Sequence, residues 1–315
     1  MTPDILDGFE HVTLPMPDDY EGAVVATLVR RRAPQRTSRA VLYLHGYIDY
    51  FFQRALAEQY LVHGIDFYAL DLRKCGRSLL PHQTPHFCKD LREYFPEIDT
   101  AVSIIRNDDE HSALLLDGHS TGGLIAPLYA HARRERHSID ALFLNSPFFD
   151  LPGSWLSREL SGPAVSAIGA LTPFTVVPAG VSRLYGESIH KDYHGEWAFD
   201  TRWKPIEGIP VRAGWLRAIR TAQRRLRAGL AILCPVLVMC STESSTLASW
   251  DDVLLRTDAV LDVDAISRDV QYLGNSVTRI NIEGGMHDLV LSAAPVRAHV
   301  YDELFRWLGA YLPAG

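Results

Sequence analysis

Cysteine, excess basic charge and long apolar runs are all scarce in this chain of 315 residues. Its four cysteines include no C-x-x-C pair, and four in a chain of this length do not make a disulfide framework. The net charge of −7 argues against the broad basic surface that duplex nucleic acid requires. Residues 1–20 carry acids and prolines but no apolar core segment, so they do not indicate a signal peptide. We therefore expect a cytoplasmic protein that binds no nucleic acid.

Residues 160–182 contain no charged side chain, and this stretch is long enough to span a bilayer. Three prolines and three glycines interrupt it, however, so no continuous apolar helix fits. We expect no transmembrane segment here and interpret the stretch as buried or as the lining of a cleft. Contact of this region with a lipid surface is the alternative.

Short β-prone runs alternate along the chain with longer segments of helical periodicity. Runs such as AVLYL, SALLL and DALFL are continuously apolar, which is typical of strands buried on both faces of a parallel sheet. Apolar residues recur at steps of three and four in residues 86–107 and 295–312, which predicts helices there. The alternation predicts an α/β fold with a mostly parallel sheet. The predicted strands are residues 23–30, 40–44, 66–71, 113–116, 141–145, 235–239 and 278–282.

The alternation is interrupted between residues 150 and 229, a region rich in proline, glycine and tryptophan. The strand pattern resumes at ILCPVLVMC, so we interpret residues 150–229 as a mostly helical cap inserted into one domain made of residues 1–149 and 230–315. Five arginines between residues 217 and 227 form a basic helical stretch within this cap. A solvated helix face is the expectation for them, and a site for an anionic substrate or a lipid headgroup is the alternative.

The sequence GHSTG at residues 118–122 matches the G-x-S-x-G motif of a nucleophilic serine. It directly follows the run SALLL and directly precedes a helical run, which is the strand–turn–helix context that the motif requires. The glycines leave room for a sharp turn, and the N-terminus of the following helix favours negative charge developing near the Ser120 hydroxyl. The motif therefore predicts Ser120 as a nucleophile.

A serine hydroxyl is a poor nucleophile until a base takes its proton. The segment RINIEGGMHDLVLS places His287 in a glycine-preceded loop just past the last predicted strand. His287 is therefore the candidate base. Structural roles are expected for His45, His63 and His119, which lie beside turns.

A second motif concerns the oxyanion of the reaction intermediate. The segment VLYLHGYIDYFFQ runs a strand directly into His45 and Gly46. A glycine there allows the N–H of Tyr47 to face a cavity. Together with the N–H of Thr121, it would supply two donors for an oxyanion hole.

The order HGY, YALDLRKCGRS, GHSTGG, NSP and GGMH resembles the α/β-hydrolase superfamily. Within it, the chain is similar to the group of serine aminopeptidases, monoacylglycerol lipases and lysophospholipases, over nearly its whole length. The resemblance implies a mostly parallel, eight-stranded sheet flanked by helices, with a helical cap between strands six and seven. It also implies hydrolysis of carboxylic esters, less often of amides, with no cofactor and no metal.

The position of the acid is where this sequence departs from the family. The family's acid usually lies a few residues after strand seven, but here the segment CSTESSTLASWDDVLLRTDAVLDVD adds a loop. We predict Asp258, because the turn TDAVLD resembles the family's acid turn and a helical run follows it. Glu243 is the rival, since it lies where an acid would fall without the added loop. The competing carboxylates are Glu243, Asp251, Asp252, Asp258, Asp262 and Asp264.

These features predict a serine hydrolase with a triad of Ser120, Asp258 and His287, acting on a small to medium, largely apolar ester. The many apolar and aromatic residues of the cap suit an acyl chain or an aromatic group. One alternative is an amide or aminopeptidase-type hydrolase, and the other is a hydrolase-fold binding protein without activity. An aminopeptidase would need acids in the cap to hold a substrate ammonium group, and the candidates are Glu187, Asp192, Glu196 and Asp200.

Overall fold

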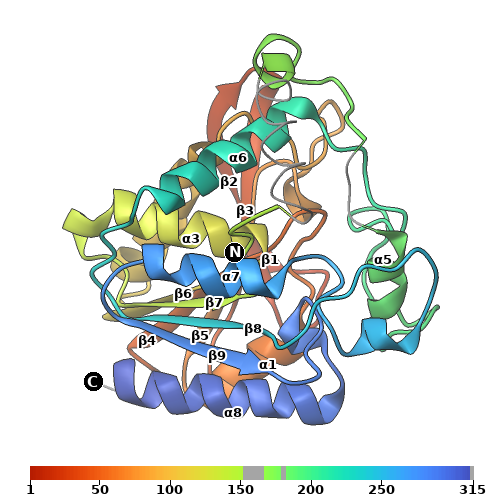
Figure 1. The fold of residues 1–315 in the computed structure, drawn as a ribbon. Coiled ribbons are helices and arrows are strands. Elements are labelled where there is room, and N and C mark those ends of the chain that lie inside the picture. The colour runs from red at the N-terminus through yellow and green to blue at the C-terminus, as the bar shows by residue number, and fades with distance from the viewer. Residues whose placement is uncertain (152–166, 179–181, 313–315) are drawn as a thin grey trace.

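The computed structural model describes residues 1–151, 167–178 and 182–312. Helices cover both faces of a single twisted sheet (Figure 1). Nine strands are present in the described residues: β1 (Thr2–Pro3), β2 (Glu10–Asp19), β3 (Gly22–Arg31), β4 (Arg39–Leu44), β5 (Asp66–Asp71), β6 (Ala113–His119), β7 (Ala141–Asn145), β8 (Val236–Ser241) and β9 (Val277–Ile282). Their order across the sheet is β1-β2-β3-β5-β4-β6-β7-β8-β9. The strands from β5 to β9 in this order are parallel, whereas β1, β2 and β3 pair antiparallel.

The structure confirms the predicted α/β fold and its mostly parallel sheet, with the two-residue β1 added at one edge. The strands predicted from β-prone composition do not include β2. It contains Pro15 and Pro17 and is mostly exposed or half-buried, so it lacks the signature of a buried strand. Proline is tolerated there because β2 lies near the edge of the sheet, where few ladder hydrogen bonds are lost.

The α-helices that surround the sheet include α1 (Arg54–Val62), α2 (Phe95–Ser103), α3 (Thr121–Ala132), α5 (Arg183–Ile189), α6 (Ala213–Arg227), α7 (Val263–Asp269) and α8 (Ala294–Tyr311). The helix predicted at residues 295–312 is α8. The helix predicted at residues 86–107 begins later, with a 3₁₀ turn at Leu91–Tyr94 that leads into α2. Asp90 caps this turn and forms a capping box with Glu93, which fixes the start of the helical segment.

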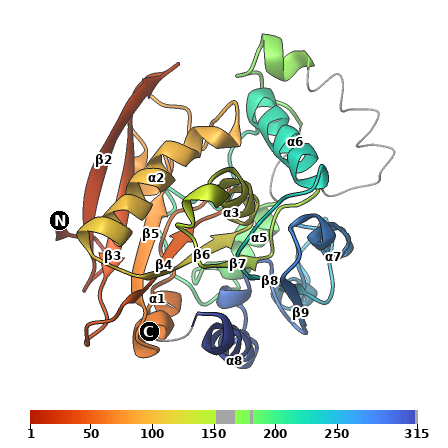
Figure 2. The same ribbon diagram turned by 90° about the vertical axis from the view of Figure 1, so that its left-hand side faces the viewer.

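Alternate residues of each central strand face opposite sides of the sheet. Val41 and Tyr43 of β4 pack in the core beneath α1 and α8, whereas Leu42 and Leu44 pack in the core with α2, α3 and α6. Both faces of β4 are therefore buried, which accounts for its continuously apolar sequence. Figure 2 shows these two helical layers on either side of the strands.

The segment between β7 and β8 contains α5, α6 and a helical stretch at residues 167–171, and residues 190–212 form mainly turns. Helix α6 packs on the core through Trp215, Ile219 and Leu226, which are buried. The basic stretch of α6 is not simply solvated, because Arg225 pairs with Asp90 and Arg227 pairs with Asp150 and Asp269.

The expectation that residues 160–182 are buried or line a cleft is wrong for the apolar side chains of residues 167–178, whereas Ser182 does line a pocket. Residues 160–166 and 179–181 lie outside the described residues. The side chains of Ile168, Leu171, Phe174 and Val176 are exposed. The small residue Gly169 lies against α6 instead, and the partly exposed ring of Phe174 stacks on that of Phe87, with centroids 4.5 Å apart. In the described part of the chain, no helix is both long and apolar enough to cross a membrane.

Candidate active site

Ser120 lies in the sharp turn between β6 and α3, with φ of 53° and ψ of −112°. This is a rare conformation for a residue with a side chain, and such strain is common at functional sites. A Cβ atom on Gly118 would lie 2.5 Å from the carbonyl oxygen of Gly122, and one on Gly122 would lie 2.2 Å from the carbonyl oxygen of Leu44. Only glycine fits at either position. The backbone of Ser120 is held by a hydrogen bond from its N–H to the carbonyl oxygen of Asn145 at 3.0 Å.

The structure brings Ser120, His287 and Asp258 together at the carboxyl ends of β6, β8 and β9. The Nε2 atom of His287 lies 3.0 Å from the Ser120 Oγ atom, and its Nδ1 atom lies 2.9 Å from Asp258 Oδ2. All three side chains are buried, and Asp258 has no exposed surface. The other oxygen of Asp258 accepts hydrogen bonds from the N–H groups of Val260 and Leu261 at 2.8 and 2.7 Å. These bonds fix the carboxylate on the ring of His287.

The added loop after β8 explains why two acids compete in the sequence. The chain leaves β8 through Glu243 and returns at Asp258, whose N–H donates to the carbonyl oxygen of Glu243 at 2.9 Å. The N–H of Ser245 donates in turn to the carbonyl oxygen of Asp258. The loop is thus closed at its base, and Asp258 lies beside the position where an acid would fall without the loop. Glu243 is exposed.

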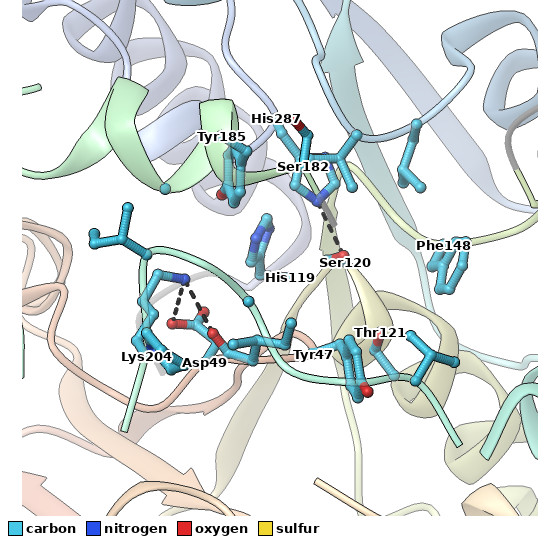
Figure 3. A pocket seen from close by; sticks show the side chains of 18 of the residues that line it. Tyr47, Asp49, His119, Ser120, Thr121, Phe148, Ser182, Tyr185, Lys204 and His287 are labelled. Carbon is cyan, nitrogen blue, oxygen red and sulfur yellow. Dashed lines mark hydrogen bonds and ion pairs between the residues drawn. The ribbon is translucent and has the colours of Figure 1, made fainter. Parts of the chain in front are cut away.

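Tyr47 and Thr121 line the same pocket as Ser120 and His287 (Figure 3). A Cβ atom on Gly46 would lie 3.1 Å from the Cβ atom of Ser120, so the backbone after β4 passes close to the serine. Thr121 is the first residue of α3, and its N–H therefore has no acceptor within the helix. Within the described residues, the N–H of Tyr47 also has no hydrogen-bond acceptor.

A polar cluster behind His287 went unrecognised in the sequence. The buried carboxylate of Asp288 accepts hydrogen bonds from the side-chain amides of Asn145 at 2.7 Å and Gln53 at 3.3 Å. The N–H of Leu289 donates to Asn145 Oδ1 at 3.3 Å, so Asn145 ties the loop of His287 to the end of β7. The signal available in the sequence was Asn145, a polar residue directly at the carboxyl end of the buried strand β7.

Two of the remaining histidines are buried near the site. The ring of His45 accepts a hydrogen bond from the N–H of Leu72 at 3.1 Å, which fixes the turn after β4. His119 lies beside His287, with ring centroids 5.0 Å apart, and its Nδ1 atom is 3.3 Å from the carbonyl oxygen of Asn145. Burial lowers the pKa of His119, which favours its neutral form.

The pocket above Ser120 holds about 1020 Å³ of empty space, including the open space at its mouth. Its lining is mostly apolar and includes Phe148, Val211 and Trp215. It also holds Asp49 and Lys204, which form an ion pair with Oδ1 and Nζ 3.0 Å apart. In Figure 3, this pair and Phe148 lie on opposite sides of Ser120.

The ion pair in the pocket is almost completely buried, with side-chain exposures of 2% for Asp49 and 9% for Lys204. Burial acts to raise the pKa of Asp49, but attraction to the Lys204 ammonium and to the rings of His45 and His119 outweighs it. The net effect lowers the pKa of Asp49 below its ordinary value, so the carboxylate stays ionised.

The four acids considered for binding a substrate ammonium do not line the pocket described here. Glu187, Glu196 and Asp200 form ion pairs with arginines, and Asp192 is exposed.

A family profile described as serine aminopeptidase, S33, matches residues 35–244. A monoacylglycerol lipase of Mycolicibacterium smegmatis is 31% identical over 150 residues, which cover 47% of this chain and 46% of that relative. The chain thus aligns with less than half the length of this curated relative.

Solved structures share the fold at low sequence identity. A monoglyceride lipase from Saccharomyces cerevisiae superposes with a TM-score of 0.72 at 16% identity, covering 99% of both chains. A monoacylglycerol lipase of Paleococcus ferrophilus superposes with a TM-score of 0.65 at 17% identity, covering 96% of this chain and 99% of that one. The chain therefore has the α/β-hydrolase fold and belongs to the serine aminopeptidase, S33, family.

Proposed function

We propose that the chain is a serine hydrolase that cleaves a small to medium, largely apolar carboxylic ester through an acyl-enzyme on Ser120. The observation that carries this proposal is the hydrogen-bonded series from Ser120 through His287 to Asp258 at the base of the pocket. This series has the order of nucleophile, base and orienting acid that acyl transfer requires.

In the proposed reaction, the Oγ atom of Ser120 attacks the ester carbon while its proton passes to Nε2 of His287. The N–H groups of Tyr47 and Thr121 stabilise the resulting oxyanion. Asp258 holds the Nδ1–H of His287, which keeps Nε2 facing the serine and stabilises the imidazolium. The alcohol leaves with the proton from His287, and a water molecule then releases the acid by the same two steps.

The chemistry of the pocket favours an ester over an aminoacyl amide. A substrate ammonium group would need an unpaired acid, but Asp49 is already neutralised by Lys204. The ammonium of Lys204 would also repel a second cation in the pocket. The apolar lining of the pocket suits an acyl chain, and the names of two similar proteins, a monoacylglycerol lipase and a monoglyceride lipase, support an acyl ester as the substrate class.

We further propose that residues 150–229 act as a cap over this site, with residues 1–149 and 230–315 as the hydrolase core. The support comes from the described part of the segment, since Tyr185, Phe199, Lys204, Val211 and Trp215 all line the pocket that contains Ser120.

Covalent labelling tests the nucleophile directly. A fluorophosphonate should label the folded wild-type protein and should fail to label Ser120→Ala. The exposed Ser112 offers a matched control, and Ser112→Ala should label like the wild type. A wild-type protein that is folded but not labelled would favour a binding protein without activity.

A hydrolysis panel then separates the substrate classes. We expect turnover of esters graded by acyl length and at least a tenfold lower kcat/KM for aminoacyl amides, since pocket contacts to acyl groups contribute roughly 1–3 kcal/mol each to such discrimination. Faster cleavage of the aminoacyl amides would contradict the ester assignment.

A further inference from the structure

The loop that carries the proposed oxyanion donor holds a strained residue. We call residues 47–50 the oxyanion loop. Ile48 in this loop has a φ of 53°, a left-handed conformation that β-branched residues rarely adopt. Such a conformation persists only where surrounding contacts hold it. The direction of the Tyr47 N–H depends on this stretch of backbone, so the contacts that hold Ile48 also bear on the oxyanion hole.

The core of the protein anchors the two flanks of the oxyanion loop. Before the loop, the His45 ring accepts a hydrogen bond from the N–H of Leu72. After it, the N–H of Phe51 donates to Asp71 Oδ1 at 2.8 Å.

Residues of the proposed cap contact every residue of the oxyanion loop. The indole ring of Trp215 stacks on the ring of Tyr47, with centroids 3.8 Å apart and planes 24° apart. Lys204 Nζ donates to the carbonyl oxygen of Ile48 at 3.4 Å and pairs with the carboxylate of Asp49 at 3.0 Å. The N–H of Asp200 donates to the hydroxyl oxygen of Tyr50 at 2.7 Å, which completes the series.

We propose that Lys204 and Trp215 are positioning residues that hold the oxyanion loop with the N–H of Tyr47 facing the reacting carbonyl oxygen. The inference rests on the proposed function, because it requires the Tyr47 N–H to be an oxyanion donor. It adds that the segment between β7 and β8 completes the catalytic geometry of the core in addition to lining the pocket.

This role predicts a defect in the transition state more than in substrate binding. A donor that stabilises the oxyanion acts only after the serine has attacked, so its misplacement lowers kcat while KM changes little. Loss of one such donor costs about 10²–10³ in kcat, and a donor that is displaced but present should cost about 10- to 100-fold.

The first experiment measures kcat and KM of Lys204→Met with the best ester of the panel. We expect kcat to fall about 10- to 100-fold and KM to stay within about threefold. Lys204→Arg, which keeps a cation and a donor for Asp49 and Ile48, should recover part of the loss. The matched control is Lys191→Met, which makes the same substitution at an exposed lysine between α5 and α6 and should match the wild type.

A pair of inhibitors separates positioning from packing. The Ser120 oxygen adds to the carbonyl carbon of an alkyl trifluoromethyl ketone, its proton passes to His287, and the ketone oxygen becomes an oxyanion. The corresponding alkyl methyl ketone binds without forming this adduct to a comparable extent. Lys204→Met should weaken only the trifluoromethyl ketone, by the same factor as kcat. Equal weakening of both ketones, or a kcat close to that of the wild type, would overturn the inference.

A second variant keeps the test decisive if Lys204→Met does not fold, as judged by thermal unfolding. Trp215→Leu removes the aromatic stacking on Tyr47, and Trp215→Phe preserves it. The inference requires Trp215→Leu to lose kcat and affinity for the trifluoromethyl ketone and Trp215→Phe to recover part of both losses, and equal losses in the two variants would overturn it. A wild-type protein that binds both ketones equally and cleaves no ester would refute the proposed function, and with it this inference.

Discussion

Among the described residues that carry side chains, three with positive φ angles lie near the carboxyl ends of the adjacent strands β4, β6 and β7. Ile48 follows β4 with a φ of 53°, Ser120 follows β6 with 53°, and Ser146 follows β7 with 45°. Backbone strain of this kind costs on the order of 1–3 kcal/mol per residue and needs support from the surrounding structure. Its concentration at one edge of the sheet matches the position of the candidate site.

At the residue scale, Ser120 and His287 should act as one unit. We expect Ser120→Ala and His287→Ala each to abolish measurable turnover of the best ester, because neither group works without the other. The double variant should be little worse than either single variant. Steady-state kinetics of the three proteins test this, and losses that multiply would show two independent contributions.

The acid of the proposed triad can be tested by comparing two carboxylates. Asp258→Asn should lower kcat by about 10⁴-fold, since an amide favours the wrong tautomer of the histidine. Glu243→Gln should stay within a few-fold of the wild type, because Glu243 is exposed while Asp258 contacts the His287 ring. Measurement of kcat at saturating ester decides between them. Loss of activity in Glu243→Gln alone would contradict the assignment of Asp258.

At the scale of elements, the sequence is most informative where burial and periodicity agree. The runs at β4 and β6 are apolar because both faces of these strands are buried, so their composition reveals them. Strand β2 is partly exposed to solvent, so its composition does not identify it as a strand. The helical segment that leads into α2 shows the limit for boundaries, because its start at Leu91 depends on the cap at Asp90 more than on the spacing of apolar residues.

The turn between β2 and β3 depends on one buried cation. Lys74 has no exposed surface, and its Nζ atom lies 2.7 Å from Asp19 Oδ2 and 2.6 Å from Glu21 Oε2. Lys74→Met should lower the free energy of unfolding by about 3 kcal/mol or more, since it leaves two carboxylates in a largely buried site without their cation.

Denaturant unfolding followed by circular dichroism measures this loss. Arg36→Gln is the control, because it breaks an exposed ion pair with Glu110 and should cost less than about 1 kcal/mol. Equal effects of the two substitutions would show that Lys74 contributes no more than a surface charge.

At the scale of the whole molecule, the contacts between distant segments were beyond the reach of local patterns. Ser120 and His287 carry recognisable motifs, and Asp258 lies in a turn that resembles the family's acid turn. Lys204 lies in no motif, and it pairs with Asp49 across 155 positions of the chain. The role of each of these two charged residues depends on its pairing with the other, so neither role could be assigned before the fold was known.

The Asp49–Lys204 pair should make the stability of the molecule depend on pH in a specific way. The pKa of Asp49 in the folded protein lies below its ordinary value of 3.8, so its contribution is present above that pH and is lost as the pH falls through the lowered folded pKa. Asp49→Asn should therefore cost about 3 kcal/mol at neutral pH, where it strands a buried ammonium. This cost should shrink below about pH 4.

Unfolding by urea at a series of pH values compares the two proteins. A difference between wild type and Asp49→Asn that stays constant from neutral to strongly acidic pH would show that the ionisation of Asp49 is not linked to folding.

The closed base of the loop between Glu243 and Asp258 offers a place to attach new sequence. Residues 246–249 are exposed, and the backbone hydrogen bonds at Glu243, Ser245 and Asp258 hold the two ends of the loop together. Because the closure entropy of a loop grows only slowly with its length, a peptide tag inserted between Ala248 and Ser249 should leave the acid in register with His287. The tip of this loop could then carry a fluorophore or an immobilisation tag that reports on the enzyme without disturbing the chemistry at its base.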